Sequence, residues 1–559
     1  MCPSLFAIRV GCAAARKKCK KVALSSLPGV GRCRSEMADS GSLIERPRRA
    51  VVFPNRVHSS LQIKDRSVSM FLGIDVGTGG TRAVLVNRSG VVVASAASEH
   101  APIHSEHIGW AEQDPDDWWR AAREAIAAVL ADPARSNAPI DAIGLTGQMH
   151  GCVMLDADGK VLRPALIWCD QRTQPECDWL EAKIGRARLI ELTCNPALPN
   201  FTLTKLLWVR THQPEIFARI AHVLCPKDYV RYKVTGEFAI DMQEASGTLL
   251  LDVTHRRWSA EVAEAAGIPM SWLPQLFEGP EICARISDAG AAATGLAAGI
   301  PVAAGAGDQG AGAVGMGIVG PGSVSATIGT SGVVFASTDR PAMDPLGRLH
   351  TFCHAAPGLW HVMGVTNGAG LSLRWFRDTF ATGFPYDALT DDAAKVPAGS
   401  DGLLWAPYLF GERTPHLDPN ARAAFVGLTA SHTRAHCTRA VMEGVAMSLR
   451  DTFSLFADLQ IPVARIRLGG GGARSPLWQQ IQADVYGHPV ELLAAEEGGS
   501  FGAALLAGVG VGAWPTVEAA CAATVHVANQ VDPQNAAAMA AAYQQFRRLY
   551  PALREIGRA

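Results

Sequence analysis

A loop of glycine and threonine that follows an aspartate is the first segment of the chain that is suited to bind phosphate. The segment reads Phe71-Leu-Gly-Ile-Asp75-Val-Gly77-Thr78-Gly79-Gly80-Thr81, and a second apolar run follows it over 83–86. Glycines let backbone N–H groups face a phosphate, and the Thr78 and Thr81 hydroxyls add donors. Asp75 ends the first run, where it can hold a hydrated Mg²⁺ through its waters. An ordinary hairpin with one solvated aspartate would have the same sequence.

A second copy of this pattern favours the phosphate-binding interpretation. The segment Ser323-Val-Ser-Ala-Thr-Ile328-Gly329-Thr330-Ser331-Gly332 is followed by another apolar run that ends at Ala336. Each copy therefore predicts a β-hairpin whose turn contains glycine and hydroxyl residues. Because some 250 residues separate the copies, the repeat indicates a duplicated domain rather than a short solenoid period.

Asp308 is the candidate general base. It lies in Gly305-Ala-Gly307-Asp308-Gln309-Gly310, between a predicted strand and a predicted helix. A carboxylate at a crowded helix start can take the proton of an attacking hydroxyl. The same letters spell G-x-G-x-x-G, a dinucleotide-binding pattern. That site requires an acidic residue about 20 positions later, and none occurs between Asp308 and Asp339.

Polar side chains follow two further predicted strands. Ile140–Leu145 is followed by Gln148-Met149-His150-Gly151, and a strand that ends near Ile167 is followed by Trp168-Cys169-Asp170-Gln171-Arg172. Ligands of open α/β sheets bind at the carboxyl ends of strands. Asp170 can accept and Arg172 can donate hydrogen bonds to hydroxyl groups, and Trp168 offers a flat apolar face. A structural histidine and a surface ion pair between Asp170 and Arg172 are the simpler alternatives.

The elements that position these residues follow from apolar periodicity and helix caps. Pro115 begins a predicted helix with Asp114 as its N-cap, and another helix begins near Ser475 and Pro476. Further helices are expected over 439–455 and over 536–553. Before Ser475 lies Leu468-Gly469-Gly470-Gly471-Gly472-Ala473-Arg474, whose four glycines allow the backbone to approach a flat ligand.

Composition excludes several classes of protein. The 51 basic and 52 acidic residues leave no excess charge that would attract nucleic acid or an anionic membrane. The 13 cysteines contain no C-x-x-C pair, which favours a reducing compartment over a disulfide framework. Residues 309–338 carry no charge, but glycines and Pro321 interrupt them, so buried strands are expected rather than a membrane span. The chain also lacks the G-x-x-x-x-G-K-[ST] phosphate loop.

Residues 1–69 differ from the rest of the chain. They contain the basic run Arg16-Lys-Lys-Cys-Lys-Lys21 and few acidic residues. A transit peptide is one interpretation. Since Met70 directly precedes the first predicted strand, we favour an unstructured extension or sequence upstream of the true start.

Together these motifs resemble the FGGY family of carbohydrate kinases. The resemblance covers 71 to about 550 and includes Gly411-Glu-Arg-Thr-Pro415. It implies an α/β fold of two actin-like ATPase (ribonuclease H-like) domains with a ligand cleft between them, an N-terminal domain over 70–315 that binds the sugar and a C-terminal domain over 316–559 that binds the nucleotide. The Gln-Met-His-Gly segment is similar to that of the family's xylulokinases, which phosphorylate D-xylulose with ATP.

The resemblance also implies a role for each motif. Asp308 would be the general base, and Asp75 would organise Mg²⁺ through water. The sugar site would comprise Met149, His150, Trp168, Asp170, Arg172 and Gln309, which replaces the commoner asparagine. The ATP site would comprise Gly77, Thr78, Gly79, Thr81, Gly329, Thr330, Ser331, Gly470, Gly471, Ala473 and Arg474.

ATP, Mg²⁺ and a small sugar are thus the expected ligands of a cytoplasmic enzyme that binds neither nucleic acid nor membrane. The sequence is compatible with a homodimer. Three alternatives remain: a kinase of the same family for another ketose or polyol such as ribulose or glycerol, an actin-like or chaperone-type ATPase that acts on partner proteins, and a dinucleotide-dependent oxidoreductase.

Overall fold

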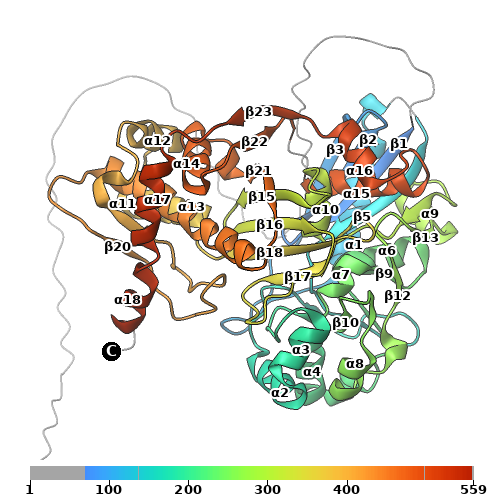
Figure 1. Ribbon diagram of the computed structural model, residues 1–559. Coiled ribbons are helices and arrows are strands. Elements are labelled where there is room, and N and C mark those ends of the chain that lie inside the picture. The colour runs from blue at the N-terminus through green and yellow to red at the C-terminus, as the bar shows by residue number, and fades with distance from the viewer. Residues whose placement is uncertain (1–68, 136–137, 496–497, 557–559) are drawn as a thin grey trace, which may run out of the picture. The chain divides into compact units, whose positions relative to one another are not determined.

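Two mixed β-sheets organise the part of the chain that the computed structural model describes, which is residues 69–135, 138–495 and 498–556 (Figure 1). These residues all belong to one compact unit. The leader predicted over 1–69 lies outside the described residues except for its last residue.

The first sheet contains the predicted N-terminal hairpin. Its six strands have the order β13-β14-β5-β1-β2-β3. In chain order they are β1 (Met70–Val76), β2 (Gly80–Asn87), β3 (Val92–Glu99), β5 (Ile140–Gly147), β13 (Ile282–Arg285) and β14 (Pro301–Ala303). β1 pairs antiparallel with β2 and parallel with β5, and β14 is parallel to β5. The loop between β1 and β2 carries Thr78, so the first predicted hairpin is confirmed.

The second sheet repeats this arrangement. Its seven strands have the order β17-β18-β16-β15-β21-β22-β23. They are β15 (Gly322–Ile328), β16 (Gly332–Thr338), β17 (His350–Cys353), β18 (Trp360–Thr366), β21 (Val463–Gly470), β22 (Val490–Leu493) and β23 (Val527–Val531). β15 is antiparallel to β16 and parallel to β21. The order β18-β16-β15-β21-β22 therefore matches β3-β2-β1-β5-β14 strand for strand, which confirms the predicted duplication.

Helices and short strand pairs surround both sheets. The helices before the second hairpin are α1 (Pro115–Leu130), α2 (Gln174–Ile184), α3 (Arg186–Thr193), α4 (Thr202–His212), α5 (Pro214–Phe217), α6 (Pro226–Thr235), α7 (Met242–Ser246), α8 (Ala260–Ala266), α9 (Asp288–Thr294) and α10 (Asp308–Gly315). Those after it are α11 (Gly370–Phe380), α12 (Tyr386–Ala394), α13 (Arg434–Asp458), α14 (Pro476–Tyr486), α15 (Gly498–Gly510), α16 (Val517–Thr524), α17 (Ala536–Phe546) and α18 (Leu549–Ile556). The short pairs are β4 (Glu112–Gln113) with β7 (Ala165–Leu166), β6 (Val153–Leu155) with β8 (His222–Leu224), β9 (Ala239–Asp241) with β12 (Gln275–Phe277), β10 (Leu251–Asp252) with β11 (Arg257–Trp258), and β19 (Leu404–Ala406) with β20 (Ala424–Val426).

The predicted helix caps are confirmed, whereas one predicted helix is wrong. The Asp114 carboxylate accepts the Asp116 N–H at the start of α1, and the Ser475 hydroxyl accepts the Trp478 N–H at the start of α14. The single helix predicted over 536–553 is instead two helices, α17 and α18. Pro551 explains the break, because its ring clashes with the carbonyl four residues earlier, at Arg547, and it has no N–H to donate.

Helix α15 packs directly on the first sheet, although the predicted boundary assigns it to the C-terminal domain. A methyl group at Gly73 of β1 would lie 1.8 Å from the Ser500 carbonyl oxygen, and one at Gly144 of β5 would lie 2.0 Å from the Ala503 carbonyl oxygen. α15 also contacts α10, because a methyl group at Gly502 would lie 1.9 Å from the Ala311 carbonyl oxygen. The first sheet, α15 and α10 therefore form one close-packed stack.

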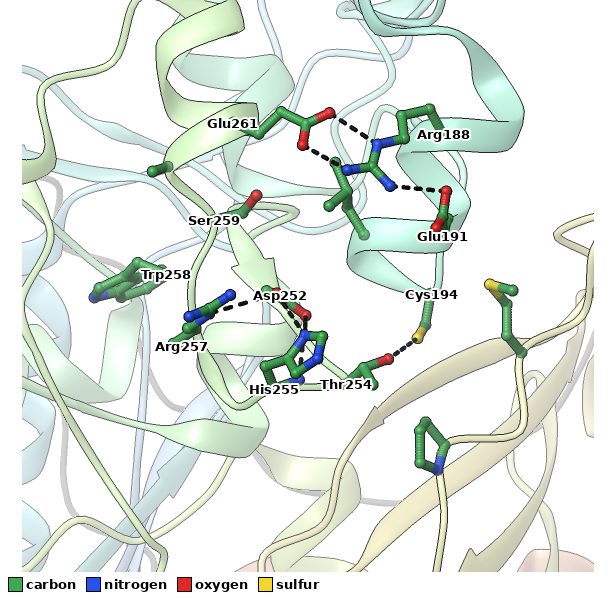
Figure 2. Close-up of a pocket in the computed structure, with 14 residues that line it drawn as sticks. Arg188, Glu191, Cys194, Asp252, Thr254, His255, Arg257, Trp258, Ser259 and Glu261 are labelled. Atoms are coloured by element: carbon green, nitrogen blue, oxygen red, sulfur yellow. Dashed lines mark hydrogen bonds and ion pairs between the residues drawn. The ribbon is translucent and has the colours of Figure 1, made fainter.

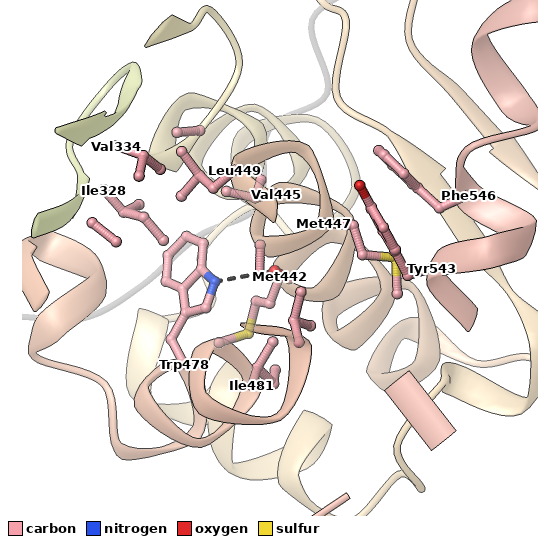
Figure 3. Packing of buried hydrophobic residues seen from close by; sticks show 14 of the residues in the cluster. Ile328, Val334, Met442, Val445, Met447, Leu449, Trp478, Ile481, Tyr543 and Phe546 are labelled. Carbon is pink, nitrogen blue, oxygen red and sulfur yellow. Dashed lines mark hydrogen bonds between the residues drawn. The ribbon is translucent and has the colours of Figure 1, made fainter. Parts of the chain in front are cut away.

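A hydrophobic cluster fills the space between the second sheet and the helices α13 and α14. Figure 3 shows Trp478 of α14 beside Ile328, with its indole N–H directed at the Met442 carbonyl of α13. That hydrogen bond measures 3.1 Å. This bond fixes the indole next to Ile328, the last residue of β15, which is the first strand of the second hairpin. Among the described residues, no helix has both the length and the apolar character that a membrane span needs.

The contact between α15 and α10 can be tested with a methyl group. Gly502→Ala should lower the apparent melting temperature, because the added carbon overlaps backbone atoms of α10 and the strain costs about 1–3 kcal/mol. Gly312→Ala in α10 is the matched control. Its methyl group would meet no heavy atom of the described residues within 4 Å, so it should raise the melting temperature through helix propensity. An increase for Gly502→Ala would contradict the packing.

Candidate active site

Asp308 lies in a cavity together with the second hairpin loop. It is the first residue of α10, and Gly307 is the N-cap. A cavity of about 290 Å³ is lined by Asp308, Gln309, Gly329 and Ser331, among other residues. In the sequence, Asp308 and Gln309 belong to the predicted catalytic segment, and Gly329 and Ser331 belong to a predicted phosphate loop. The fold brings all four residues to the lining of the same cavity.

Two carboxyl groups with raised pKa values dominate the electrostatics of this region. Burial, followed by the negative charge of Asp75, raises the pKa of Asp308 to about 7. Burial also raises the pKa of Asp75 to about 6, and Arg82 partly opposes that shift. The Gln309 amide donates to Oδ1 of Asp308 at 3.4 Å. Asp308 is therefore a carboxylate whose protonation changes near neutral pH, as suits a general base.

The first hairpin loop lies next to Asp75. Gly79 is exposed at its tip, and the Gly77 N–H closes the turn on the Gly80 carbonyl at 3.0 Å. The Thr78 hydroxyl donates to Gln148 Oε1 at 3.3 Å. Thr81 is fully buried, and its hydroxyl contacts the His100 ring at 2.9 Å. The Thr81 hydroxyl therefore already has a partner in this structure, and a role for Thr81 in ATP binding stays a prediction.

A larger cavity lies at the glycine-rich loop after β21. It measures about 680 Å³, and Gly329, Thr330, Gly471 and Arg474 contribute to its lining. The backbone here is crowded, since a methyl group at Gly472 would lie 2.6 Å from Cβ of Ile328. Gly470 has a φ of +72°, a left-handed conformation that favours glycine. Ala473 lies in the same turn, and its carbonyl accepts the Gln479 amide.

The second hairpin loop connects the two cavities. Gly329 lines both of them, with Thr330 on the side of the larger cavity and Ser331 on the side of Asp308. All three residues are exposed. An elongated ligand can therefore occupy the larger cavity and extend past the hairpin loop to the carboxylate of Asp308.

Met149 and His150 lie against the segment that enters α10. A methyl group at Gly307 would lie 2.6 Å from Cγ of Met149. The His150 ring contacts the Gly247 carbonyl through Nδ1 at 2.7 Å. Because a carbonyl only accepts, Nδ1 carries the hydrogen. Burial lowers the pKa of His150 to about 3, so the ring is neutral and Nε2 is left as an acceptor.

The Trp168–Arg172 segment contributes no residue to the lining of either cavity. Trp168 is 41% exposed, and its indole N–H donates to the Thr78 hydroxyl at 2.9 Å, so it adjoins the first hairpin loop. Asp170 is fully buried and pairs with Arg172 at 2.7 Å. The ion pair that we considered as a surface alternative therefore exists, but it is buried. Arg172 also contacts Glu112 at 2.8 Å. A sugar contact for Asp170 or Arg172 stays a prediction.

Several residues near the site were not identified from the sequence. Gln243 of α7 accepts the Gly307 N–H, and Lys205 donates to the His150 carbonyl at 2.9 Å. Arg374 and Tyr386 line the larger cavity. These residues lie on helices outside the motifs on which the sequence analysis relied. The Gly307 contact also argues against the dinucleotide alternative, because the N–H expected to face a pyrophosphate is already bonded.

The Gly-Glu-Arg-Thr-Pro segment forms a buried hydrogen-bond network. Glu412 and Arg413 do not bond through their side chains. Oε1 of Glu412 accepts the backbone N–H groups of Asn367 and Arg413, at 2.9 Å and 2.7 Å, and the Arg413 guanidinium contacts the His350 ring at 2.8 Å. Burial raises the pKa of Glu412 to about 8. The segment therefore joins β17 to the loop that precedes α11.

A separate cavity of about 650 Å³ lies at α3, α8 and the loop between β10 and β11. Figure 2 shows that its charged residues pair with one another: Arg188 lies between Glu191 and Glu261, and Asp252 contacts His255. Its lining contains none of the residues that the motifs predicted for the site. We therefore place the candidate active site at the two cavities that share Gly329.

The residues at Asp75 fit a hydrated divalent cation. Oδ1 of Asp75 is buried and has no hydrogen-bond partner among the described residues, and neither does the neighbouring Thr146 hydroxyl. Both side chains adjoin Gly499, since a methyl group there would lie 3.3 Å from an Asp75 oxygen and 3.3 Å from Thr146. An unpartnered carboxylate oxygen is the kind of ligand that Mg²⁺ uses alongside water and phosphate.

Comparison with known proteins agrees with this geometry. Residues 70–315 match the N-terminal domain of the FGGY family of carbohydrate kinases, and residues 324–511 match its C-terminal domain. The chain is similar to xylulose kinases of Bacillus subtilis (38% identity; 80% of this chain, 89% of the relative) and Escherichia coli (40%; 87% and 99%). The crystal structure of xylulose kinase from Rhodospirillum rubrum has a TM-score of 0.83 at 33% identity, over 88% of this chain and all of that one. The chain belongs to the FGGY family of carbohydrate kinases, with the two actin-like ATPase domains of that fold.

Proposed function

We propose that the protein transfers the γ-phosphoryl group of ATP to the 5-hydroxyl of D-xylulose, which yields D-xylulose 5-phosphate and ADP. The similarity to xylulose kinases supports this choice of sugar. The structural observation that carries the proposal is the position of Gly329 in the lining of both cavities. A nucleotide with its adenosine in the larger cavity would then extend its terminal phosphate toward Asp308.

Asp308 acts as the general base in this proposal. Its carboxylate accepts the proton of the 5-hydroxyl as O5 forms a bond to the γ-phosphorus. The bond from that phosphorus to the β,γ-bridging oxygen breaks, and ADP leaves. The raised pKa of Asp308 supports this role. A carboxylate with a pKa of about 7 holds a proton more firmly than an ordinary carboxylate does, and it still ionises near neutral pH.

The hairpin loops hold the phosphates. Gly77, Thr78, Gly79 and Thr81 form the first phosphate loop, and Gly329, Thr330 and Ser331 form the second. Gly471 and Arg474 line the cavity proposed for adenosine, and Gly470 and Ala473 belong to the turn that carries them. Asp75 would hold Mg²⁺ through water, and the ion, when bound, would neutralise charge on the β- and γ-phosphates. The unpartnered Oδ1 of Asp75 supports this assignment.

The sugar contacts Met149, His150, Trp168 and Gln309. Asp170 and Arg172 belong to the same sugar site in this proposal, and their ion pair supports the loop that carries Trp168. Nε2 of neutral His150 accepts a hydrogen bond from a sugar hydroxyl, and Gln309 presents its amide beside Asp308. We further propose a sugar-binding domain over 70–315 and a nucleotide-binding domain over 316–559. A cytoplasmic location and a homodimer stay predictions from the sequence.

A sugar panel tests the proposed substrate. ADP release is measured with D-xylulose, D-ribulose and glycerol, and without an acceptor. We expect kcat/KM for D-xylulose to exceed the other values by at least roughly tenfold, because one mismatched hydroxyl costs about 1–3 kcal/mol in a polar pocket. Faster turnover of ribulose or glycerol would support the other ketose or polyol. Equal ADP release without any acceptor would indicate an ATPase instead.

His150→Asn tests the sugar side of the site. Asparagine tolerates the left-handed backbone of His150, whose φ is +68°. The variant should raise the KM for D-xylulose roughly fivefold to tenfold and leave the KM for ATP within about twofold, since the lost hydrogen bond is worth about 1–1.5 kcal/mol. His255→Asn, on the exposed wall of the separate cavity, is the control and should change neither constant. A similar increase in both KM values for His150→Asn would show that His150 has a folding role instead.

A further inference from the structure

The short helix α7 lies between the two segments that carry the proposed base and the proposed sugar contacts. Its residue Gln243 is 1% exposed and uses both ends of its amide. Oε1 accepts the Gly307 N–H at 2.7 Å, and Nε2 donates to the sulfur of Met149 at 3.4 Å. One side chain therefore holds the residue before Asp308 and the side chain of Met149 at the same time.

The amide of Gln243 also packs against the first turn of α10. A methyl group at Gly310 would lie 2.8 Å from Cγ and 2.9 Å from Cδ of Gln243, and one at Gly307 would lie 2.7 Å from its Oε1. Glycine at both positions lets the amide approach the backbone. Because Gly307 is the N-cap of α10, its orientation determines the direction in which Asp308 enters the cavity.

Helix α7 is itself firmly held. The Asp241 carboxylate caps it by accepting the Glu244 N–H at 2.9 Å, and Asp241 pairs with Lys227 at 2.6 Å. Oε1 of Glu244 accepts the His150 N–H at 3.2 Å, and the Ser246 hydroxyl accepts the Cys353 N–H at 3.0 Å. With α7 anchored to three other segments, through Lys227, His150 and Cys353, a change at Gln243 cannot be offset by a simple shift of the helix.

We propose that Gln243 is a positioning residue that sets the proposed base Asp308 and the proposed sugar contact Met149 in one mutual arrangement. The inference rests on the proposed function. Oε1 acts on the reaction through Gly307 and Asp308, and Nε2 acts on sugar binding through Met149. The two effects are separable, because each depends on one end of the amide.

Three variants separate the two effects. Gln243→Met keeps the length of the side chain but removes both hydrogen bonds, so kcat should fall roughly tenfold to a hundredfold and the sugar KM should rise, with the ATP KM unchanged. Gln243→Glu keeps an acceptor for the Gly307 N–H and should retain kcat within about threefold when assayed at about pH 9, above the pKa of Asp308. Met149→Leu replaces the thioether with a branched alkyl group of similar volume, which removes the sulfur acceptor, and it should raise the sugar KM with little change in kcat.

Thr294→Val, which removes a buried hydroxyl that bonds within α9 at 2.7 Å, is the stability control. It should lower the melting temperature without changing kcat or either KM. Wild-type kcat and KM in Gln243→Met would overturn the proposal, as would a loss of kcat in Gln243→Glu equal to that in Gln243→Met. If Gln243→Met does not fold, a loss of kcat of roughly tenfold or more in Gln243→Glu, or an unchanged sugar KM in Met149→Leu, would overturn the proposal. Because every comparison is made with wild-type turnover, failure of the proposed function itself would show as an inactive wild type.

Discussion

The repulsion between the buried carboxyl groups of Asp75 and Asp308 is the constraint on which the candidate site depends. Desolvation penalises charge on both groups, and the negative charge of Asp75 makes ionisation of Asp308 less favourable still. Such a pair destabilises the folded state unless a cation or a proton from the substrate compensates its negative charge. The rest of the architecture brings these two carboxyl groups close together and keeps a cavity beside them.

Close helix packing provides this arrangement. Asp75 is carried by β1 and Asp308 begins α10, and α15 contacts both elements through glycines that allow its backbone to approach. The duplicated sheet contributes the other wall through the second hairpin, whose Gly329 adjoins both cavities. Of the two hairpins that the duplication supplies, the second therefore borders both cavities, and the first carries Asp75 in its leading strand.

Most of the framework could be predicted from the sequence because it depends on local rules. The glycine turns at 77–80 and 329–332 determine the hairpins, and Asp114 and Ser475 cap helices as their positions predict. The break before α18 was missed because the periodicity of 536–553 was weighed above Pro551. The orientation of Asp170 and Arg172 was not predictable either, since it depends on Glu112 and Ala111, which are distant in the sequence. Gln243 belongs to the same class, because its partners Gly307 and Met149 become neighbours only in the folded chain.

The pH dependence of kcat/KM for D-xylulose tests the central assignment most directly. It is measured below both KM values, so that it reports the free enzyme, with Mg²⁺ in excess because free ATP titrates in the same range. A protonated carboxyl group cannot accept the substrate proton, so activity should rise with pH through a midpoint near 7, the pKa of Asp308, and then level off. Asp308→Asn should lose this rise together with most of its activity. A wild-type profile that is flat down to about pH 5, or the same rise in Asp308→Asn, would contradict the role of Asp308 as the base.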